Sequence, residues 1–360
     1  MSDERPDLPT ADITALRTVV RDGWYNAFTD LALWKDMYWL CYRRGTSHVA
    51  GNSVEVVLRS DDLRRWRPVI DFESPAGVAD GCAAADGHFC TTPDRLYLFI
   101  GTRNPIHSYV SWTDDGVHWS QPALLSLGDD HPYTWRVRWR EGLFYSAICH
   151  LHHEERPFEL IVSDDGIHWT RRAEIVTRAE LPEFTEESEL YWRPDGELWC
   201  IVRANNASMY WSQPPYTTWE GGDLQVKCDA PVICRTAGKE YLAGRVRLPG
   251  AESGGDPTQF QGGEWGGIGN GTTGLYYLTK GKAELIRYFS QGGDASYPGL
   301  VSPEPGKLVI SYYSDVAYWT GLVKPRHFAE FRYKSSESDI YLAEIEVPKI
   351  SDAPQAVDTK

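Results

Sequence analysis

Short runs of alternating apolar and polar residues follow one another along the chain, separated by turns rich in glycine, proline and aspartate. Alternation with a period of two is typical of β-strands that bury one face. Only Asp12–Arg21 is expected to form a short helix. Paired runs with a tight turn between them predict six β-hairpins, at Leu31–Arg43, Cys82–Thr102, Trp135–His150, Leu190–Arg203, Val232–Arg245 and Gly299–Tyr313.

A short turn motif recurs in the first two thirds of the chain. Ser60–Trp66 reads SDDLRRW, Thr113–Trp119 reads TDDGVHW and Ser163–Trp169 reads SDDGIHW, and a degenerate copy ends at Trp219. The four tryptophans lie 53, 50 and 50 residues apart. Ser, Thr and Asp side chains cap tight turns, and we expect each tryptophan to pack against the neighbouring repeat.

Each period also contains a further short strand after its hairpin. These strands are expected at Ser53–Arg59, Ser108–Thr113, Phe158–Ser163 and Ala207–Trp211. Three or four antiparallel strands repeated about every 50 residues are typical of a propeller blade. We therefore predict an all-β fold, a six-bladed β-propeller. A five-bladed propeller is the alternative, if the long unit at 228–290 and the termini are divided differently.

The length of the chain, 360 residues, fits one large β domain. We predict a single propeller domain over residues 24–347, preceded by an N-terminal segment at 1–23. The region 249–273 is rich in glycine and polar residues, and 317–336 is rich in aromatic and basic residues, so both are predicted to be insertions. Residues 348–360 are expected to form a tail.

The composition of the chain restricts the possible functions more than it restricts the possible folds. The net charge of −15 argues against a nucleic acid or an anionic membrane as partner. The content of 15 Trp and 20 Tyr favours strands and surfaces that bind carbohydrate. The seven cysteines form no C-x-x-C pair and are expected to be buried, reduced thiols. The polar N-terminus shows no signal peptide, so a cytoplasmic location is expected unless a leader has been removed.

The stretch Thr185–Arg203, TEESELYWRPDGELWCIVR, combines acidic and basic groups at one end of a predicted hairpin. Alternation places Glu187 and Glu189 on the same face of its first strand. The Pro-Asp-Gly turn at 194–196 brings the chain back so that Arg203 lies near the two carboxylates. Carboxylates beside an anion-binding guanidinium indicate a candidate site.

Arginines occur at matching points of three hairpins. Arg43, Arg203 and Arg245 each stand four residues after an aromatic residue of the returning strand. Such arginines either pair with surface carboxylates or converge to bind a carboxylate-bearing sugar, for which a bidentate guanidinium is suited. We name all three as candidate substrate-binding residues, and we add to them Arg44, His48 and Arg136.

Candidate catalytic side chains stand where the first strand of several blades begins. They are Asp30, Asp80, Glu187, Glu189 and Tyr297, the last shortly after Asp294. Two carboxylates that face each other across a pocket are the minimal apparatus of glycoside cleavage. A single aspartate at a strand start more often caps a turn, so the prediction depends on their convergence.

Histidine suggests two other kinds of chemistry. His150, His152 and His153 form a cluster whose spacing matches no closed metal site, and we expect neither a metal nor another cofactor. A histidine or tyrosine base beside arginines would also suit β-elimination from a uronic acid. A uronate lyase is therefore an alternative to a hydrolase, and a non-catalytic carbohydrate-binding propeller is another.

The repeated S/T-D-D-G-x-x-W turns resemble a contracted form of the Asp-box of the sialidase superfamily. The segment Glu186–Arg203 also resembles the sialidase strand pair in which a glutamate precedes an arginine by about one hairpin, and Asp294–Val301 resembles the segment with the nucleophilic tyrosine. The resemblance implies that Glu187 activates Tyr297 as nucleophile and that Arg203 and Arg245 bind the carboxylate of an acidic sugar. It implies an exo-acting glycoside hydrolase.

The same resemblance leaves open the acid/base, for which Asp30 and Asp80 are candidates. Sialidases carry their first arginine in a Phe-Arg-Ile-Pro segment, but the corresponding residues 27–30 here read Ala-Phe-Thr-Asp. Arg43 or Arg44 would have to compensate from the next strand. The expected substrate is therefore a sialic, ulosonic or uronic acid.

A second resemblance is to five-bladed furanosidases and inverting arabinosidase or xylosidase-type hydrolases, through the Ser-Asp-Asp-Leu turn at 60–63. It implies a neutral sugar as substrate. Asp30 would then be base or nucleophile, Asp80 would orient it, and Glu187 or Glu189 would be the acid.

Overall fold

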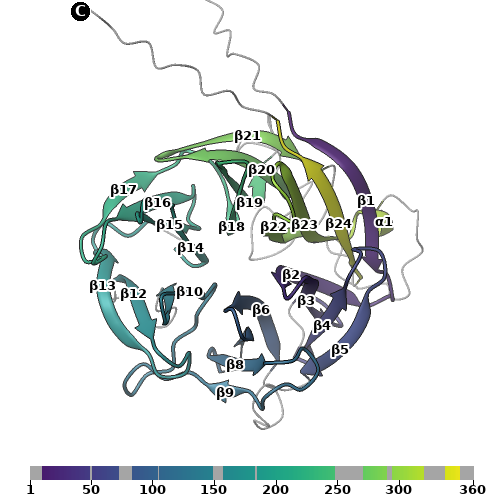
Figure 1. Cartoon of the computed structure of the whole chain (residues 1–360), viewed down its shortest axis with the longest axis horizontal. Helices are drawn as coiled ribbons and strands as arrows, with labels where there is room; N and C mark the ends of the chain where they lie inside the picture. Colours follow the sequence, from purple (N-terminus) through teal and green to yellow (C-terminus); the bar gives the residue numbers. More distant parts are fainter. Residues whose placement is uncertain are drawn as a thin grey trace, which may run out of the picture.

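Six four-stranded antiparallel sheets stand around a common axis, as Figure 1 shows, so the fold is a six-bladed β-propeller. The computed structural model describes residues 10–48, 51–72, 83–103, 105–148, 157–182, 185–247, 271–289, 294–319 and 337–348. The prediction of six blades is confirmed, and the five-bladed alternative is wrong. Each of the six predicted hairpins forms the two innermost strands of one blade.

The first five blades follow one another along the chain, each built outward from the axis. Their strands are, for blade 1, β2 (Tyr25–Trp34), β3 (Met37–Gly45), β4 (Val54–Ser60) and β5 (Arg67–Phe72); for blade 2, β6 (Ala84–Thr91), β7 (Leu96–Thr102), β8 (Ser108–Thr113) and β9 (Ala123–Leu124); for blade 3, β10 (Arg138–Arg140), β11 (Leu143–Ile148), β12 (Phe158–Ser163) and β13 (Thr170–Val176); for blade 4, β14 (Ser188–Trp192), β15 (Leu198–Val202), β16 (Ser208–Ser212) and β17 (Glu220–Asp223); and for blade 5, β18 (Asp229–Thr236), β19 (Lys239–Arg247), β20 (Gly271–Thr279) and β21 (Lys282–Tyr288).

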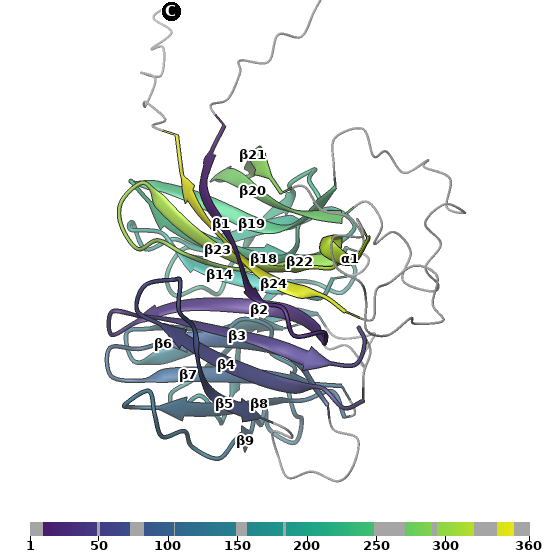
Figure 2. The ribbon, with the colours of Figure 1, turned by 90° about the vertical axis from the view of Figure 1, so that its right-hand side faces the viewer.

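Blade 6 joins the two ends of the chain. Its strands, from the axis outward, are β22 (Ala295–Val301), β23 (Lys307–Ser314), β24 (Asp339–Glu346) and β1 (Asp12–Val20), and a short helix, α1 (Val316–Trp319), follows β23. Figures 1 and 2 both show β1 beside β24, with which it pairs antiparallel. The ring is therefore closed by hydrogen bonds between the first and last strands.

The helix expected over Asp12–Arg21 is wrong, because these residues form β1. Half-buried and exposed positions alternate along the strand, but Leu16 is exposed and Arg17 is half-buried. That inversion of residue type hides the period of two. Blade 6 consequently draws on residues on both sides of the predicted boundary at residue 23.

The recurring turns are held by the second aspartate of each motif. Asp115 Oδ1 accepts hydrogen bonds from the backbone N–H groups of Val117 and His118, each at 2.8 Å, and Asp62 and Asp165 make the same pair of bonds in their own turns. The tryptophan that ends a motif packs on the preceding blade. Trp119 lies 6.2 Å from Trp39 between ring centroids, and Trp169 lies 6.4 Å from Phe99. The turns therefore fasten neighbouring blades together, as expected.

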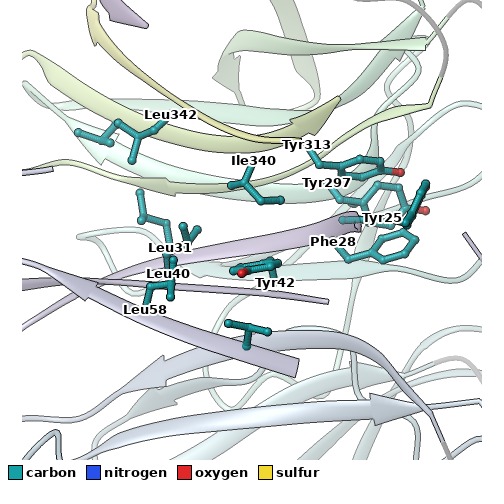
Figure 3. Packing of buried hydrophobic residues seen from close by; sticks show 14 of the residues in the cluster. Tyr25, Phe28, Leu31, Leu40, Tyr42, Leu58, Tyr297, Tyr313, Ile340 and Leu342 are labelled. Carbon is teal, nitrogen blue, oxygen red and sulfur yellow. The ribbon is translucent and has the colours of Figure 1, made fainter. Parts of the chain in front are cut away.

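The innermost strands of blades 1, 5 and 6 share an irregularity close to the axis. The pairing register shifts between Ala27 and Asp30 in β2, and matching shifts occur in β18 and β22. At these points Phe28, Ala230 and Tyr297 have φ of 56°, 50° and 51°. A β-bulge of this kind turns a side chain that regular pleating would place elsewhere. Figure 3 shows Phe28 and Tyr297 together at one end of the core cluster between blades 1 and 6.

Gly299 lies where β22 passes closest to β2. A Cβ atom added there would be 2.1 Å from the backbone nitrogen of Leu31 and 2.6 Å from the carbonyl carbon of Asp30. Because backbone atoms must move, we expect Gly299→Ala to lower the free energy of unfolding by about 3 kcal/mol, the upper range for overpacking. Urea unfolding measures this. The matched control is Gly222→Ala, where a Cβ meets nothing within 4 Å; equal stabilities of the two variants would contradict the prediction.

Several predicted features lie outside the described residues. These are Asp80, the three histidines at 150–153, Cys82, Cys149, most of the two predicted insertions and nearly all of the predicted tail. Five cysteines are described, and all are free thiols, with Cys234 half-buried and the other four buried. Within the described parts of the chain, no helix is long and apolar enough to cross a membrane.

Candidate functional site

Side chains from blades 1, 4, 5 and 6 meet where the innermost strands of these blades begin. Tyr297 stands at the bulge of β22, and its ring packs edge-on against Phe28 at 4.7 Å and Trp135 at 5.8 Å between centroids. The guanidinium of Arg245 lies over the same ring, 4.7 Å from its centroid. The tyrosine hydroxyl donates a hydrogen bond of 2.7 Å to Glu187, which directly precedes β14.

Glu187 is the centre of this group. Its Oε1 accepts hydrogen bonds from Tyr297 and from Arg203 at 2.5 Å, and its Oε2 accepts one from the backbone N–H of Ala230 at 2.5 Å. Burial raises the pKa of Glu187, although Arg203 opposes the shift. The carboxylate is therefore a stronger base than an exposed glutamate, and it is already hydrogen-bonded to the phenol.

Tyr297 is a neutral phenol in this resting arrangement. Its burial and the neighbouring Glu187 carboxylate raise the pKa of Tyr297 well above its ordinary value, while Arg203 and Arg245 act in the opposite direction. A phenolate would consequently form only if its proton passed to Glu187 as the oxygen reacts. That is the geometry of a nucleophile with its own base.

Arg203 lies between acidic groups of two blades. It contacts Glu187, Glu186 at 2.9 Å and Asp229 at 3.2 Å, and its Nη1 lies 3.2 Å from the Tyr297 hydroxyl. Its side chain remains 22% exposed. The guanidinium is therefore held in place and still accessible to a ligand.

Arg245 is fixed by blade 6. Its Nε donates to the carbonyl of Ala295 at 2.9 Å, and its Nη2 donates to the Tyr313 hydroxyl at 3.0 Å and lies 3.3 Å from Asp294. Asp294 is fully buried and also accepts hydrogen bonds from the hydroxyls of Tyr25 and Tyr313. Figure 3 shows the side chains of Tyr25, Tyr297 and Tyr313 gathered together.

Arg43 occupies the expected strand position, but its guanidinium binds backbone carbonyls of a loop. It is completely buried, its guanidinium lies 4.5 Å from the centre of the Phe28 ring, and its Nη2 donates to the carbonyls of Ser47 at 3.3 Å and His48 at 2.6 Å. It therefore holds the loop that carries His48. Arg44 pairs instead with Asp71 of the outer strand β5 at 2.7 Å, and the structure does not bring it to Tyr297.

Asp30 and Glu189 belong to a separate buried network. Asp30 pairs with Arg136 at 2.6 Å and accepts the backbone N–H of Phe89 at 2.8 Å. Glu189 binds Arg138 through two hydrogen bonds of 2.8 and 2.5 Å. All of these side chains except Arg138 are almost wholly buried.

The network changes what these candidates can do. Burial alone would raise the pKa of Asp30, but Arg136 and His88 hold it well below its usual range, so Asp30 is a poor proton donor. Arg136 donates its other N–H groups to the carbonyls of Pro231 and Pro298, at 3.0 and 2.8 Å. As a correction to the sequence-based roles, we assign Asp30, Glu189 and Arg136 to holding the blades together.

Sequence reasoning missed Asp229 and Lys227 of blade 5, which pair at 2.7 Å beside Arg203. A signal existed: Asp229-Ala-Pro and Asp294-Ala-Ser-Tyr-Pro both place an aspartate and a proline around the bulge of an innermost strand. Within the described ranges, no group of three or more His, Cys, Asp or Glu side chains is placed so that it could hold a metal ion.

Known proteins resemble this chain in structure. No family model matches it, and no curated protein matches it in sequence. A protein of unknown function from Dyadobacter fermentans superposes with a TM-score of 0.71 at 17% identity, covering 95% of this chain and 100% of its own. The endosialidase of phage phi92 has a TM-score of 0.69 at 11% identity, with coverage of 98% and 71%.

A sialidase from Trypanosoma rangeli also superposes, with a TM-score of 0.59 at 12% identity. The match covers 90% of this chain but only 55% of the trypanosomal one, so this chain spans about half the length of that enzyme. Identities this low show a shared sialidase-like propeller fold and no more than the fold.

Proposed function

We propose that the protein is a sialidase-like glycoside hydrolase, exo-acting on an acidic sugar such as a sialic, ulosonic or uronic acid. The observation that carries the proposal is the 2.7 Å hydrogen bond from the Tyr297 hydroxyl to the buried Glu187 carboxylate. Arg203 and Arg245 flank this pair. The sialidase-like fold supports the proposal, since it is compatible with this chemistry.

In the proposed reaction, the Tyr297 oxygen attacks the anomeric carbon while Glu187 takes its proton. A neutral nucleophile suits an anionic substrate, because a carboxylate nucleophile would repel the negative charge of the sugar. Arg245, which lies over the ring, would stabilise the negative charge that develops on the phenol oxygen. A covalent glycosyl–tyrosine intermediate forms and water then hydrolyses it, so the configuration at the anomeric carbon is retained.

The two arginines suggest the charge of the substrate. Arg203 and Arg245 come from different blades, and both are held by protein carboxylates, so their guanidinium groups need little reordering when a ligand arrives. Bidentate hydrogen bonding to a sugar carboxylate is the use to which such groups are best suited. The buried Arg43 supports the loop rather than the substrate in this account.

The proposal is tested by turnover of aryl glycosides of sialic, ulosonic, uronic and neutral sugars. We expect turnover of an acidic glycoside, and we expect Arg203→Ala to reduce kcat/KM by about 10²-fold or more, in line with loss of a charge-assisted hydrogen bond at a buried site. Arg44→Ala is the matched control, because Arg44 pairs with Asp71 away from Tyr297. Turnover of neutral glycosides alone, unchanged by Arg203→Ala, would contradict the proposal.

One observation favours a second candidate, a uronate lyase. The Tyr25 hydroxyl lies 2.7 Å from Nδ1 of His48, so a tyrosine–histidine pair stands beside the arginines. Such a pair would serve to abstract the proton α to a carboxylate that an arginine neutralises. An unsaturated product that absorbs in the ultraviolet would identify this reaction.

A further inference from the structure

The hydrolysis proposed above needs a group that protonates the leaving oxygen, and Tyr297 and Glu187 do not supply it. The sequence offered Asp30 and Asp80 for this role. Asp30 pairs with Arg136 and accepts a hydrogen bond from the backbone N–H of Phe89, and Asp80 lies outside the described residues. Another described side chain near Tyr297 must therefore supply the proton, and histidine is the side chain that ordinarily exchanges one near neutral pH.

His48 and Tyr297 both pack against Phe28. The imidazole packs edge-on against the Phe28 ring, with centroids 5.3 Å apart, and the Tyr297 ring packs against the same ring at 4.7 Å. Phe28 itself lies at the bulge of β2 and has a φ of 56°. The imidazole is 18% exposed, whereas the neighbouring side chains of Asp294 and Phe28 are buried.

A buried carboxylate orients this histidine. Nδ1 of His48 lies 2.5 Å from Asp294 Oδ2, and Asp294 is wholly buried. An ionised carboxylate only accepts hydrogen bonds, so Nδ1 carries the proton in this contact and proton exchange falls to Nε2. Asp294 is itself fixed by Tyr313 and Arg245, which prevents the carboxylate from turning away.

The backbone of His48 is also held. Arg43 donates to its carbonyl at 2.6 Å and to that of Ser47 at 3.3 Å. The Arg43 side chain that holds this loop is positively charged and completely buried. A loop that merely connected β3 to β4 would not need such an anchor, whereas a loop that must place a catalytic ring within a fraction of an ångström does.

We propose that His48 is the general acid and base of the reaction, and that Asp294 and Arg43 are its positioning residues. The inference rests on the proposed function. In the first step the bond from the anomeric carbon to the leaving oxygen breaks, the bond to Tyr297 forms, the tyrosine proton passes to Glu187, and protonated His48 gives its proton to the leaving oxygen. In the second step water attacks the anomeric carbon, the bond from that carbon to the Tyr297 oxygen breaks, His48 accepts a water proton, and Glu187 returns its proton to Tyr297.

The surroundings of His48 combine both signs of charge. His48 contacts Asp294, Tyr25 and Phe28, and Tyr313 and Arg245 contact the same Asp294 carboxylate. Arg245 pairs with Asp294 at 3.3 Å, so a positive charge faces the carboxylate that contacts the imidazole. The imidazole therefore contacts an apolar ring and a carboxylate that is itself paired with an arginine.

The test uses two glycosides of whichever acidic sugar the full-length enzyme hydrolyses. One has a dinitrophenol leaving group, which departs without protonation, and the other has an unactivated alkyl leaving group, which requires it. We expect His48→Gln to lower kcat/KM for the alkyl glycoside by about 10²–10⁴-fold and for the dinitrophenyl glycoside by less than about tenfold. Asp294→Asn should reproduce this selectivity with a smaller loss, and Arg44→Ala should leave both substrates unaffected.

Each other outcome would overturn the inference. Equal losses on both glycosides would give His48 a merely structural role, and a wild-type rate for His48→Gln on the alkyl glycoside would remove it from the reaction. An unsaturated product would make His48 the base of an elimination instead. If the wild-type enzyme turns over no acidic glycoside at all, the proposed function fails, and this inference fails with it. Urea unfolding of His48→Gln separates loss of folding from loss of chemistry.

Discussion

Tyr297→Phe and Glu187→Gln should each abolish most of the turnover of an acidic glycoside. Removing the base alone is expected to cost about 10²–10⁴-fold in kcat, the usual contribution of a positioned acid or base. Removing the nucleophilic oxygen should cost at least as much. Because the 2.7 Å hydrogen bond makes the two residues one unit, the double variant should be little worse than either single variant.

A pH profile adds a readout that a structural defect would not give. The reaction needs ionised Glu187, whose pKa burial raises above its ordinary value of 4.5 despite Arg203. Turnover by the wild-type enzyme should therefore fall as the pH decreases through this raised pKa, and Glu187→Gln should lack that acid limb. Full turnover by either single variant, with the limb unchanged, would exclude the pair from the chemistry.

Asp30→Ala is expected to produce the largest loss of stability. Arg136 is 1% exposed, and its ionic partner at 2.6 Å is Asp30. Removing the carboxylate leaves a buried guanidinium without that partner, which typically costs about 3–5 kcal/mol of the free energy of unfolding. The Phe89 N–H also loses its acceptor. Urea unfolding at neutral pH measures the change.

Asp71→Ala is the matched control, because Asp71 pairs with Arg44 at the surface, where such a pair contributes about 1 kcal/mol or less. The direction in which the contribution of Asp30 to stability changes with pH also follows from its pKa. The pKa of Asp30 is lowered in the folded protein, so its contribution to stability is present above its unfolded value of 3.8 and is lost as the pH falls through the folded value. Equal stabilities of the Asp30 and Asp71 variants would contradict the structural role assigned to Asp30.

The blades were predictable because each is a local unit. A hairpin and a third strand arise from residues close in sequence, and the S/T-D-D turns join the third strand to the outermost strand of blades 1 to 3. The outermost strand of blade 6 was not predictable in this way. β1 pairs with β24, more than 300 residues later, and its exposed Leu16 and half-buried Arg17 reverse the usual residue types.

The candidate site likewise has a part that the sequence could predict and a part that it could not. Glu187 and Arg203 belong to one hairpin, and spacing predicted Arg245. Tyr297 was predicted from its place near a strand start and from the resemblance of its segment to that of sialidases; the structure brings these four together. Spacing could not foresee which carboxylates would meet an arginine from another blade.

The sequence placed Asp30 and Glu189 at equivalent strand starts, but Asp30 lies within β2, after its bulge, and Glu189 lies at the start of β14. Asp30 pairs with Arg136, which precedes blade 3, and Glu189 pairs with Arg138 of β10. The positive φ at Tyr297, which turns its ring toward Glu187, is equally invisible in the sequence. Contacts between blades, and not within them, therefore decide which acidic groups remain for chemistry.

The most direct test of the central claim is to trap the covalent intermediate on Tyr297. A derivative of the accepted acidic sugar with one fluorine as leaving group on the anomeric carbon and a second fluorine on the neighbouring ring carbon would slow hydrolysis of the adduct, because the second fluorine destabilises the positive charge of the transition state. We predict that the peptide containing Tyr297 gains the mass of the fluorinated sugar and that Tyr297→Phe gains none. Label on another residue, or turnover of substrate with no adduct, would contradict the account.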